Sequence, residues 1–410
     1  MLHCIDLFAG AGGLSEGFER QGFKFVAHIE MDYAASLTLK TRQAYFYLKR
    51  NKKLDLYKKY IKGQISREEF YLNIPEKVFR KVINREISDD SISEIFNIID
   101  QNRKGKQIDV IVGGPPCQAY SLMGRARDPK KMKEDKRNYL YKQYIRFLVK
   151  YKPKIFVFEN VVGLLSSKGG KIFNDMKKEF EKAGYKIDYK LLDASDFGVP
   201  QKRKRIIIIG WNENVDFIYP EFKKDDKYRS FNIRTLFEDL PAIKSGEDYS
   251  DFLYSNNPNT FLKKTKIRKK WDVLTQHVSR YNNERDLNIY KKCVEVWNTE
   301  HRKLKYNELP QNLITHKNIN SFLDRFNVVP YDGISHTVVA HICKDGHYYI
   351  HPDIKQNRSI SIREAARIQT FPDDYYFENS RTTAFKQIGN AVPPLMAEKI
   401  AKVIKQKIDK

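Results

Sequence analysis

The sequence has little of what marks a secreted or membrane protein. Its 410 residues include only four cysteines, Cys4, Cys117, Cys293 and Cys343. They lie far apart and form no C-x-x-C pair, which argues against a disulfide framework and against a zinc site or other bound metal. No apolar run approaches the roughly 20 residues of a membrane-spanning helix. The first residues, M-L-H-C-I-D-L, lack the basic start of a signal peptide. We therefore expect a cytoplasmic protein that does not associate with membranes.

Acidic residues are scarce relative to basic ones. The chain has 75 Lys and Arg against 51 Asp and Glu, which gives a formal net charge of +24. Such a balance favours a polyanionic partner, most simply nucleic acid, although a solvated basic surface would give the same count. Hydrophobic residues make up 41% of the chain, enough for a globular protein of two or three domains and too many for a disordered one.

Short apolar strands alternate with helices in the first half of the chain. The pattern predicts strands at 2–8, 24–30, 109–112, 154–159 and 205–211, and helices at 14–21 and 139–150. Continuous apolar strands separated by helices indicate a mostly parallel sheet that is covered on both faces. The predicted fold class is therefore α/β, with a doubly wound, Rossmann-like sheet.

The chain divides into further parts. Residues 46–106 are charged, helical in period and longer than a usual crossover connection, which predicts a helical insertion within a first domain at 1–220. This insertion fits a solvated surface element, and a DNA-backbone contact is the alternative. Residues 221–380 mix turn residues, aromatics and lysines with pieces such as H-T-V-V-A-H-I, and predict a second, smaller, irregular domain rich in strands. Residues 381–410 are expected to return to the first domain, with a last helix from about residue 390.

The segment D-L-F-A-G-A-G-G-L-S, residues 6–15, has the form of a strand, a glycine turn and a helix start. Such a turn can bind a nucleotide-like ligand. Gly10 and Gly12 fit the dinucleotide fingerprint G-x-G-x-x-G, but Ser15 stands at its third position. Glu30 ends the next strand, where a carboxylate can hold a ribose diol. These features suit NAD and S-adenosylmethionine equally, and Glu30 alone fits a surface carboxylate as well.

The segment G-G-P-P-C-Q, residues 113–118, stiffens the exit of a predicted strand. Two prolines fix their own φ angles and push the preceding residues into extended conformations, whereas the glycines allow close approach to the backbone. A rigid bend that presents Cys117 suits a nucleophile. A buried structural cysteine is the more common fate of this residue type, so these residues alone do not decide between the two.

Six motifs in a fixed order give the chain a specific resemblance. They are D-L-F-A-G-A-G-G (6–13), G-G-P-P-C-Q (113–118), E-N-V (159–161), Q-K-R-K-R (201–205), R-E-A-A-R-I-Q-T-F-P (363–372) and Q-I-G-N-A-V-P-P (387–394). This ordered set, which spans nearly the whole chain, resembles the cytosine-C5 DNA methyltransferases. The resemblance implies an enzyme of a restriction–modification system that flips a cytosine out of double-stranded DNA and methylates it with S-adenosylmethionine.

The resemblance also implies covalent catalysis. Carbon 5 of cytosine is a poor nucleophile, and addition of a thiolate to C6 makes it a better one. Cys117 matches the family nucleophile, and Glu159 matches the residue that engages N3 of the base. Arg205 is expected at O2 of the flipped cytosine. Arg203 is expected at the active site, and the alternative is that it holds Glu159 or the loop instead. Without the resemblance, we would interpret Glu159 as the partner of a lysine and the arginines as a basic strand end.

Other site residues follow from the same resemblance. The cofactor pocket is expected to use Phe8, Gly10, Gly12, Glu30, Met31, Glu86, Ile87, Leu140 and Asn390, with Glu86 standing where the family usually has Asp. The basic stretch after the nucleophile is similar to a mobile loop that closes over DNA. The expected DNA contacts are Ser121, Arg125, Arg127, Lys130, Lys131 and Thr337, the last in a target-recognition domain that corresponds to residues 221–380.

Three alternatives were weighed against this hypothesis. A tRNA cytosine-C5 methyltransferase of the same fold is disfavoured because the region between the fourth and fifth motifs is long. A catalytically silent DNA-binding scaffold would be expected to have lost Cys117, Glu159 or the glycine turn, and all three are intact. A nicotinamide oxidoreductase is disfavoured by Ser15 and by the basic charge. We expect a monomer that acts on double-stranded DNA, with a cognate restriction endonuclease encoded alongside.

Overall fold

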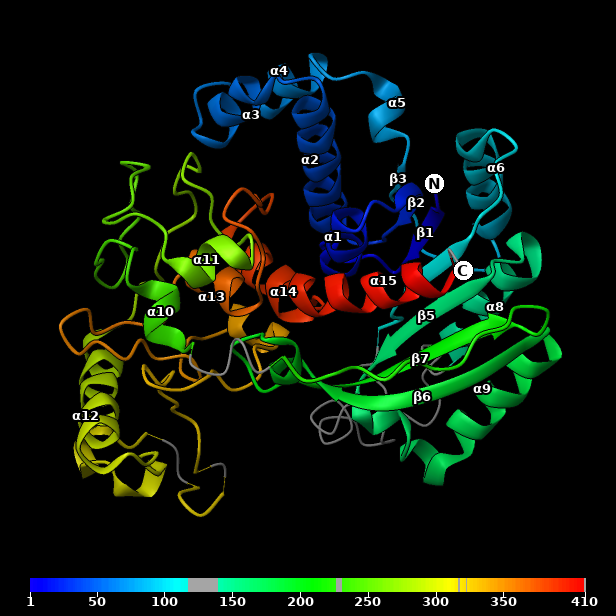
Figure 1. Cartoon of the computed structure of the whole chain (residues 1–410). Coiled ribbons are helices and arrows are strands. Elements are labelled where there is room, and N and C mark those ends of the chain that lie inside the picture. Colours follow the sequence, from blue (N-terminus) through cyan, green and yellow to red (C-terminus); the bar gives the residue numbers. More distant parts are fainter. Residues whose placement is uncertain (117–138, 226–230, 316–317, 322, 409–410) are drawn as a thin grey trace.

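A seven-stranded sheet forms the centre of the computed structural model, which describes residues 1–116, 139–225, 231–315, 318–321 and 323–408 (Figure 1). Its strands are β1 (His3–Leu7), β2 (Lys24–Ile29), β3 (Val82–Ile83), β4 (Val110–Gly113), β5 (Ile155–Asn160), β6 (Tyr185–Asp193) and β7 (Lys204–Asn212). The order across the sheet is β3-β2-β1-β4-β5-β7-β6. Strand β7 pairs antiparallel with both β5 and β6, and the other pairs are parallel.

Helices cover both faces of this sheet. In the first half of the chain they are α1 (Gly13–Arg20), α2 (Tyr33–Arg50), α3 (Leu54–Ile61), α4 (Arg67–Leu72), α5 (Glu76–Phe79), α6 (Ile92–Arg103), α8 (Leu140–Tyr151) and α9 (Lys171–Lys182). Strand β7 shows the two faces directly, because side chains alternate along a strand. Ile206 and Ile208 pack in one apolar core with α6, α8 and α9, whereas Ile207 and Ile209 pack in another with α1 and the C-terminal helix. The predicted doubly wound, mostly parallel sheet is thus confirmed.

The order of the strands reverses beside β1, which lies between β2 and β4. In open α/β sheets, ligands bind in the crevice outside the carboxyl ends of the strands at such a switch point. The glycine turn follows β1 there, and the segment 113–116 follows β4 there. The fold therefore places the two motifs that the sequence analysis singled out at the same edge of the sheet.

The region 46–106 is more varied than the predicted helical insertion. It starts inside α2, contains α3, α4 and α5, and then continues into β3 and α6. Strand β3 belongs to the sheet and α6 packs on one of its faces. The helices beyond the α/β alternation are thus α3 to α5, which pack with α2 around an aromatic core (Figure 1).

The region 221–380 corrects one expectation. It contains α10 (Ile233–Phe237), α11 (Thr260–Lys264), α12 (Glu284–Glu300) and α13 (Ile362–Ile368). Its described residues form isolated bridges but no extended strand, so the prediction of a strand-rich domain is wrong. The reason is visible in H-T-V-V-A-H-I, where the N–H of Val338 donates to the side chain of Gln201 and that of Val339 donates to the Tyr349 hydroxyl, instead of to a neighbouring strand.

Two helices, not one, form the C-terminal segment. Helix α14 (Arg381–Asn390) ends where the last helix was expected to begin, and α15 (Pro394–Ile408) follows it. Proline at the first position suits a helix start, because its missing N–H would have no partner there. Helix α15 crosses in front of the sheet beside α1 (Figure 1), and its Leu395, Met396 and Ile400 pack against the strands.

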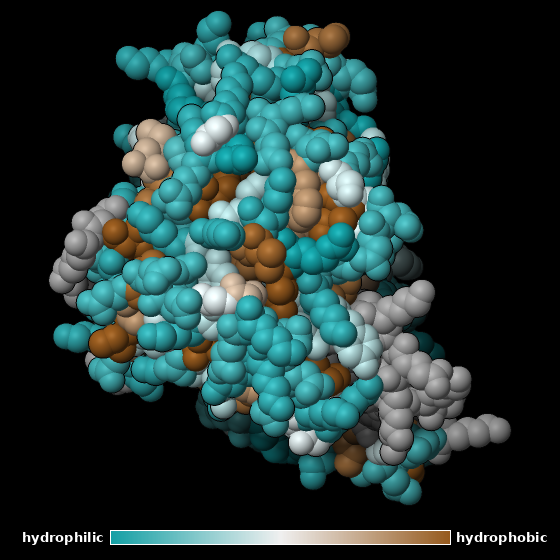
Figure 2. Space-filling model, turned by 90° about the vertical axis from the view of Figure 1, so that its right-hand side faces the viewer, coloured by the Kyte–Doolittle hydropathy of each residue, from teal (hydrophilic) through white to brown (hydrophobic). Residues whose placement is uncertain are grey.

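The molecular surface is mainly hydrophilic on the face shown in Figure 2, where hydrophobic residues gather only in small separate groups. Among the described helices, none combines the length and the apolar character that crossing a membrane requires.

The contact between α1 and α15 generates the first prediction. A Cβ atom at Gly17 would lie 2.4 Å from the backbone nitrogen of Glu398 and 2.5 Å from the Ala397 carbonyl carbon. We expect Gly17→Ala to lower the free energy of unfolding by about 1–3 kcal/mol through overpacking, although alanine favours a helix by about 0.5–1 kcal/mol. Thermal denaturation measures the effect.

The matched control is Gly333→Ala, because an added Cβ there meets Pro330 only at ordinary contact distances of 3.4 and 3.5 Å. Equal melting temperatures for the two variants would contradict the close packing of α1 on α15.

Candidate active site

The glycine turn after β1 has a backbone that few residues can adopt. Phe8, Gly10 and Gly12 have φ angles of 55°, 54° and 78°. A positive φ is ordinary for glycine but strained for phenylalanine, and such strain often accompanies a functional site. A Cβ at Gly12 would lie 2.8 Å from Leu39 Cδ2, whereas a Cβ at Gly10 would meet nothing within 4 Å. The turn is therefore packed on its Gly12 side and open at Gly10, as a cradle for a ligand would be.

Glu30 ties the end of β2 to this turn. Its Oε2 accepts a hydrogen bond from the N–H of Gly10 at 2.7 Å, and its Oε1 accepts one from the N–H of Asp32 at 2.7 Å. The side chain is largely buried. Burial raises the pKa of Glu30, and the two N–H donors act in the opposite direction by favouring the ionised form. A carboxylate held in this way lies directly beside the open position of the turn.

The other expected cofactor residues are distributed around this edge. Met31 follows Glu30 and is 60% exposed, and Glu86, after β3, is also exposed. Ile87 is buried in the apolar core that also contains residues of α6 and α8, so its side chain packs inside the protein. Leu140 begins α8 and is half-buried. Asn390 is exposed at the end of α14.

Helix α14 is fixed to the β2 end of this edge by an ion pair. Lys386 Nζ donates to Asp32 Oδ2 at 2.8 Å, and Asp32 Oδ1 accepts the N–H of Ala35 at the start of α2. This hydrogen bond, with the Asp32 charge, raises the pKa of Lys386. The sequence analysis did not include Lys386, because a lysine immediately before Q-I-G-N gives no signal of its partner.

Glu159 and Arg205 form the second part of the site. Glu159 lies on β5 and Arg205 on the neighbouring β7, and Arg205 Nε lies 2.9 Å from Glu159 Oε1. Their side chains are 14% and 13% exposed, so the pair is shielded from water but open at one side. The partner of Glu159 is thus an arginine and not the lysine of the alternative interpretation. This contact engages Oε1, one of the two carboxylate oxygens of Glu159.

The chain segment before Cys117 packs against this pair. A Cβ at Gly114 would lie 2.7 Å from Glu159 Oε2, so glycine is required for this approach. Asn160 is buried, and its Nδ2 donates to the Pro115 carbonyl at 3.3 Å. Pro115 is buried and Pro116 exposed, so the chain emerges from the core immediately before the predicted nucleophile. Cys117 itself lies outside the described residues, as do Ser121, Arg125, Arg127, Lys130 and Lys131.

The remaining three cysteines lie in described parts of the chain. Cys4 and Cys293 are buried, and Cys343 is partly exposed. Burial raises the pKa of the Cys4 thiol well above its usual value and that of Cys293 to about 12. A thiol needs the opposite shift to act as a nucleophile at neutral pH.

Arg203 binds other segments of the chain than Arg205 does. Its guanidinium is buried and donates to the carbonyls of Val338, Ala391 and Gly389 at 2.7, 2.9 and 3.3 Å. These carbonyls belong to the second region and to the end of α14. We therefore interpret Arg203 as a positioning residue that holds three segments together, and its expected place at the active site stays a prediction.

Gln201 and Thr337 take part in the same contacts between these segments. Gln201 is buried, accepts the N–H of Val338 at 2.8 Å and donates to Gln369 Oε1 at 3.0 Å. The hydroxyl of Thr337 donates to the Lys202 carbonyl. Thr337 is thus fixed to the Q-K-R-K-R segment, and its expected contact with DNA stays a prediction. Gln201 was missed as a site residue although it begins that motif.

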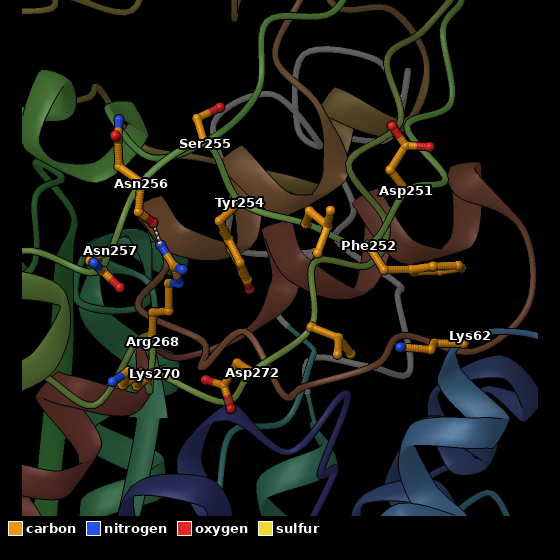
Figure 3. Close-up of a pocket in the computed structure, with 12 residues that line it drawn as sticks. Lys62, Asp251, Phe252, Tyr254, Ser255, Asn256, Asn257, Arg268, Lys270 and Asp272 are labelled. Atoms are coloured by element: carbon orange, nitrogen blue, oxygen red, sulfur yellow. Dashed lines mark hydrogen bonds between the residues drawn. The ribbon is translucent and has the colours of Figure 1, made fainter.

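A separate cavity of about 500 Å³ lies between the end of α3 and the segment 251–273 (Figure 3). Arg268 lies over the Tyr254 ring at 3.4 Å and donates to the Asn256 carbonyl, and Lys62 reaches toward the Phe252 ring. None of the site residues expected from the sequence lines this cavity. It is therefore distinct from the site formed by Glu30, Glu159 and their neighbours.

Comparison with known proteins adds an independent line of information. The model of the family "C-5 cytosine-specific DNA methylase" matches residues 2–70 and 68–406. The chain is 42% identical over 440 residues to the type II methyltransferase M.Bpa9945I of Bacillus paralicheniformis, covering 99% of each protein. It is 31% identical to the type II methyltransferase M.DdeI of Desulfomicrobium norvegicum, over 98% of this chain and 88% of that protein.

Among solved structures, the chain is similar to a prophage-encoded protein of E. coli described as a DNA modification methyltransferase. The TM-score is 0.65, the sequence identity is 22%, and both chains are covered completely. At this identity the likeness shows that the two proteins share a fold.

The hydrogen bonds of Arg203 generate the second prediction. Lysine cannot donate to three carbonyls with a planar fork of N–H groups. We expect Arg203→Lys to lower the free energy of unfolding by roughly 2–4 kcal/mol, because buried carbonyls lose their donors. Urea denaturation measures it.

Arg80→Lys serves as the control, since Arg80 is exposed and pairs only with exposed Glu76. A change within about 0.5 kcal/mol is expected there. If both substitutions cost the same, Arg203 does not hold the segments together.

Proposed function

Because the chain belongs to the C-5 cytosine-specific DNA methylase family, we propose that it transfers a methyl group to carbon 5 of a cytosine in double-stranded DNA, as part of a restriction–modification system. The observation that carries the proposal is the Glu159–Arg205 pair, held against the segment that leads to Cys117. It offers a carboxylate and a guanidinium to a flat polar ring next to the position expected for a thiol.

S-adenosylmethionine is the proposed cofactor and would supply the methyl group. The residues present fit such a ligand. The open side of the turn at Gly10 leaves room, and the buried carboxylate of Glu30 lies beside it to accept hydrogen bonds from ribose hydroxyls. Met31 and Glu86, both exposed, are proposed to line the cofactor pocket as well.

The chemistry follows from the roles proposed for three residues. The Cys117 thiolate adds through Sγ to C6 of the flipped cytosine, which moves electron density to C5 and toward N3. Glu159 holds a proton or hydrogen bond at N3, and Arg205 stabilises the charge that develops at O2. After the methyl group has reached C5, a base such as water takes the C5 proton, and the electrons of that C–H bond restore the C5–C6 double bond as Sγ departs as the thiolate; the spent cofactor would be S-adenosylhomocysteine.

The DNA contacts are proposed from the basic stretch that follows Cys117. Ser121, Arg125, Arg127, Lys130 and Lys131 would contact phosphates, which gives binding without sequence selection. Selection is proposed to come from the region 221–380, including the segment at Thr337. A cognate restriction endonuclease is the proposed functional partner, and a monomer the proposed acting form.

The tRNA alternative is not favoured. The relatives at 42% and 31% identity are named as type II methyltransferases, and the likeness to the Dnmt2 methyltransferase of S. pombe, with 13% identity and a TM-score of 0.52, concerns the fold. A silent scaffold is not favoured either, since such a protein has no need to keep Glu159 and Arg205 paired behind Gly114.

A trapping experiment tests the covalent step. Fluorine at C5 cannot leave as a proton, so duplex DNA with 5-fluorocytosine at the target, together with S-adenosylmethionine, is expected to leave the protein bound through Sγ. The adduct should survive denaturing electrophoresis. Cys117→Ser should reduce adduct formation by at least about a thousandfold, because a hydroxyl is a far weaker nucleophile than a thiolate.

Cys343→Ser is the matched control, because Cys343 is the partly exposed cysteine of the described chain. It should form the adduct at the rate of the unchanged protein. An adduct that persists in Cys117→Ser and disappears in Cys343→Ser would assign the nucleophile elsewhere. Equal adduct formation on a tRNA substrate would favour the tRNA alternative.

A binding experiment tests the cofactor site. Glu30→Gln replaces one carboxylate oxygen by an amide donor, so we expect its affinity for S-adenosylmethionine in calorimetry to fall roughly 10- to 100-fold. Glu94→Gln, at an exposed position on α6 where the carboxylate pairs with Arg85, should bind as the unchanged protein does. Unaltered affinity in a folded Glu30→Gln protein would place the cofactor elsewhere.

A further inference from the structure

One side of the expected cofactor site is formed at the end of β3, which is a very short strand. Strand β3 has two residues, which pair with His28 and Ile29 of β2. The last backbone hydrogen bond between the strands runs from the N–H of Glu30 to the Ile83 carbonyl at 3.1 Å. Beyond it the backbone turns away, since the N–H of Arg85 also donates to Ile83. The carbonyls of Glu30 and Met31 therefore lie past the end of the ladder.

The side chain of Asn84 continues the ladder at this point. Its Nδ2 donates to the Glu30 carbonyl at 2.9 Å and to the Met31 carbonyl at 3.1 Å. An amide nitrogen has two hydrogens, so both are used. One side chain thus fixes two successive peptide groups, and with them the directions of the Glu30 and Met31 side chains.

Asn84 also connects the two sides of the expected pocket. Glu30 and Met31 stand on one side, and Glu86 and Ile87 come two and three residues after Asn84 on the other. We propose that Asn84 is a positioning residue for the cofactor: by holding the Glu30 and Met31 carbonyls, it keeps the Glu30 carboxylate and the Met31 side chain where S-adenosylmethionine binds. This inference rests on the proposed function and adds to it a residue that neither the motifs nor the comparisons single out.

The chain contains a natural control for this arrangement. Asn102, at the end of α6, donates through Nδ2 to the carbonyls of Val26 and Arg80 at 3.2 and 3.0 Å. Val26 lies on β2 and Arg80 just before β3, so this amide bridges the same two segments at the opposite end. Both asparagines are half-buried. Asn102 therefore matches Asn84 in donating through Nδ2 to two backbone carbonyls, and it differs in belonging to α6 and in lying at the far end of the two segments.

Aspartate is the informative substitution at both positions. It has the size of asparagine but offers no donor, and its charge repels the two carbonyls. For Asn84→Asp we expect the dissociation constant and the KM for S-adenosylmethionine to rise roughly tenfold, as loss of two hydrogen bonds at a binding edge predicts. We expect kcat at saturating cofactor to change less than about twofold, because Asn84 contacts no reacting atom.

Calorimetry with S-adenosylmethionine and steady-state kinetics on duplex DNA measure these quantities, with thermal melts to check folding. Asn102→Asp should lower the melting temperature by a similar amount and leave KM and kcat unchanged. If Asn84→Asp does not fold, Asn84→Ala, which introduces no charge, should show the same rise in KM.

Each outcome supports or contradicts the positioning role of Asn84. A folded Asn84 variant that binds the cofactor as the unchanged protein does would overturn the inference while leaving the proposed function intact. An equal rise in KM for Asn102→Asp would show that the effect is only structural, and would also overturn it. Failure of the unchanged protein to bind S-adenosylmethionine would instead remove the proposed function, and the inference with it.

Discussion

The close packing of α15 on α1 is the contact on which the rest of the structure depends. A Cβ at Gly13 would lie 2.2 Å from the Val392 carbonyl oxygen, and one at Gly17 would lie 2.4 Å from the Glu398 nitrogen. The two helices can therefore approach only because α1 has glycine at both positions. Gly13 is also the first residue of α1 after the glycine turn. The segment that leads into the last helix therefore contacts the chain directly beside the expected cofactor site. Helix α14, which immediately precedes α15, is brought to the edge at Glu30 by the same contact, and the ion pair between Lys386 and Asp32 keeps it there.

The additional helices α3 to α5 support the segment that leads into α14. Tyr60 of α3 donates to Glu378 at 2.7 Å, and the N–H of Glu378 donates to Thr38 of α2 at 2.8 Å. Thr38 in turn donates to Gln387 of α14 at 2.7 Å.

Nearby, Arg42 of α2 binds both Glu16 and Asp374 at 2.8 Å. Burial alone would raise the pKa of Asp374, but Arg42 and Lys269 lower it, so the buried carboxylate stays charged. Buried ion pairs contribute less to stability than to a defined geometry in some systems. Here they fix the segment that leads into α14, and we interpret the extra helices as its support.

The sequence was sufficient for what depends on local pattern and insufficient for what depends on distant partners. Apolar runs predicted β1, β2, β4, β5 and β7 within two residues at each end, because each is buried on both faces. Strand β6 was missed because Tyr185 is its one buried residue and the others are half-buried or exposed, as at an edge, and β3 was missed because two residues carry no period. Arg203 belongs to a basic motif that is typical of a surface. It is nevertheless buried, and it donates to carbonyls that lie 135 or more residues away in the sequence. The strand-like H-T-V-V-A-H-I does not pair as a strand, because side chains of Gln201 and Tyr349 take its N–H groups. Asn84 had no signal at all, since its two acceptors are backbone atoms.

The course of the chain up to Pro116, the residue before Cys117, is set by residues on three strands. Gly113 pairs with β1 so closely that a Cβ would lie 2.3 Å from the Leu7 carbonyl oxygen. Gly114 lies against the Glu159 carboxylate, and Asn160 binds the Pro115 carbonyl. Strands β1, β4 and β5 thus all contribute to the position from which the chain emerges at Pro116. Because Glu159 is itself paired with Arg205 on β7, any movement of this segment toward the carboxylate is opposed by two neighbouring strands. For the nucleophile that we propose at Cys117, a fixed starting point at Pro116 is an advantage, because groups held on the rigid elements of a scaffold are placed more precisely than groups on loops alone.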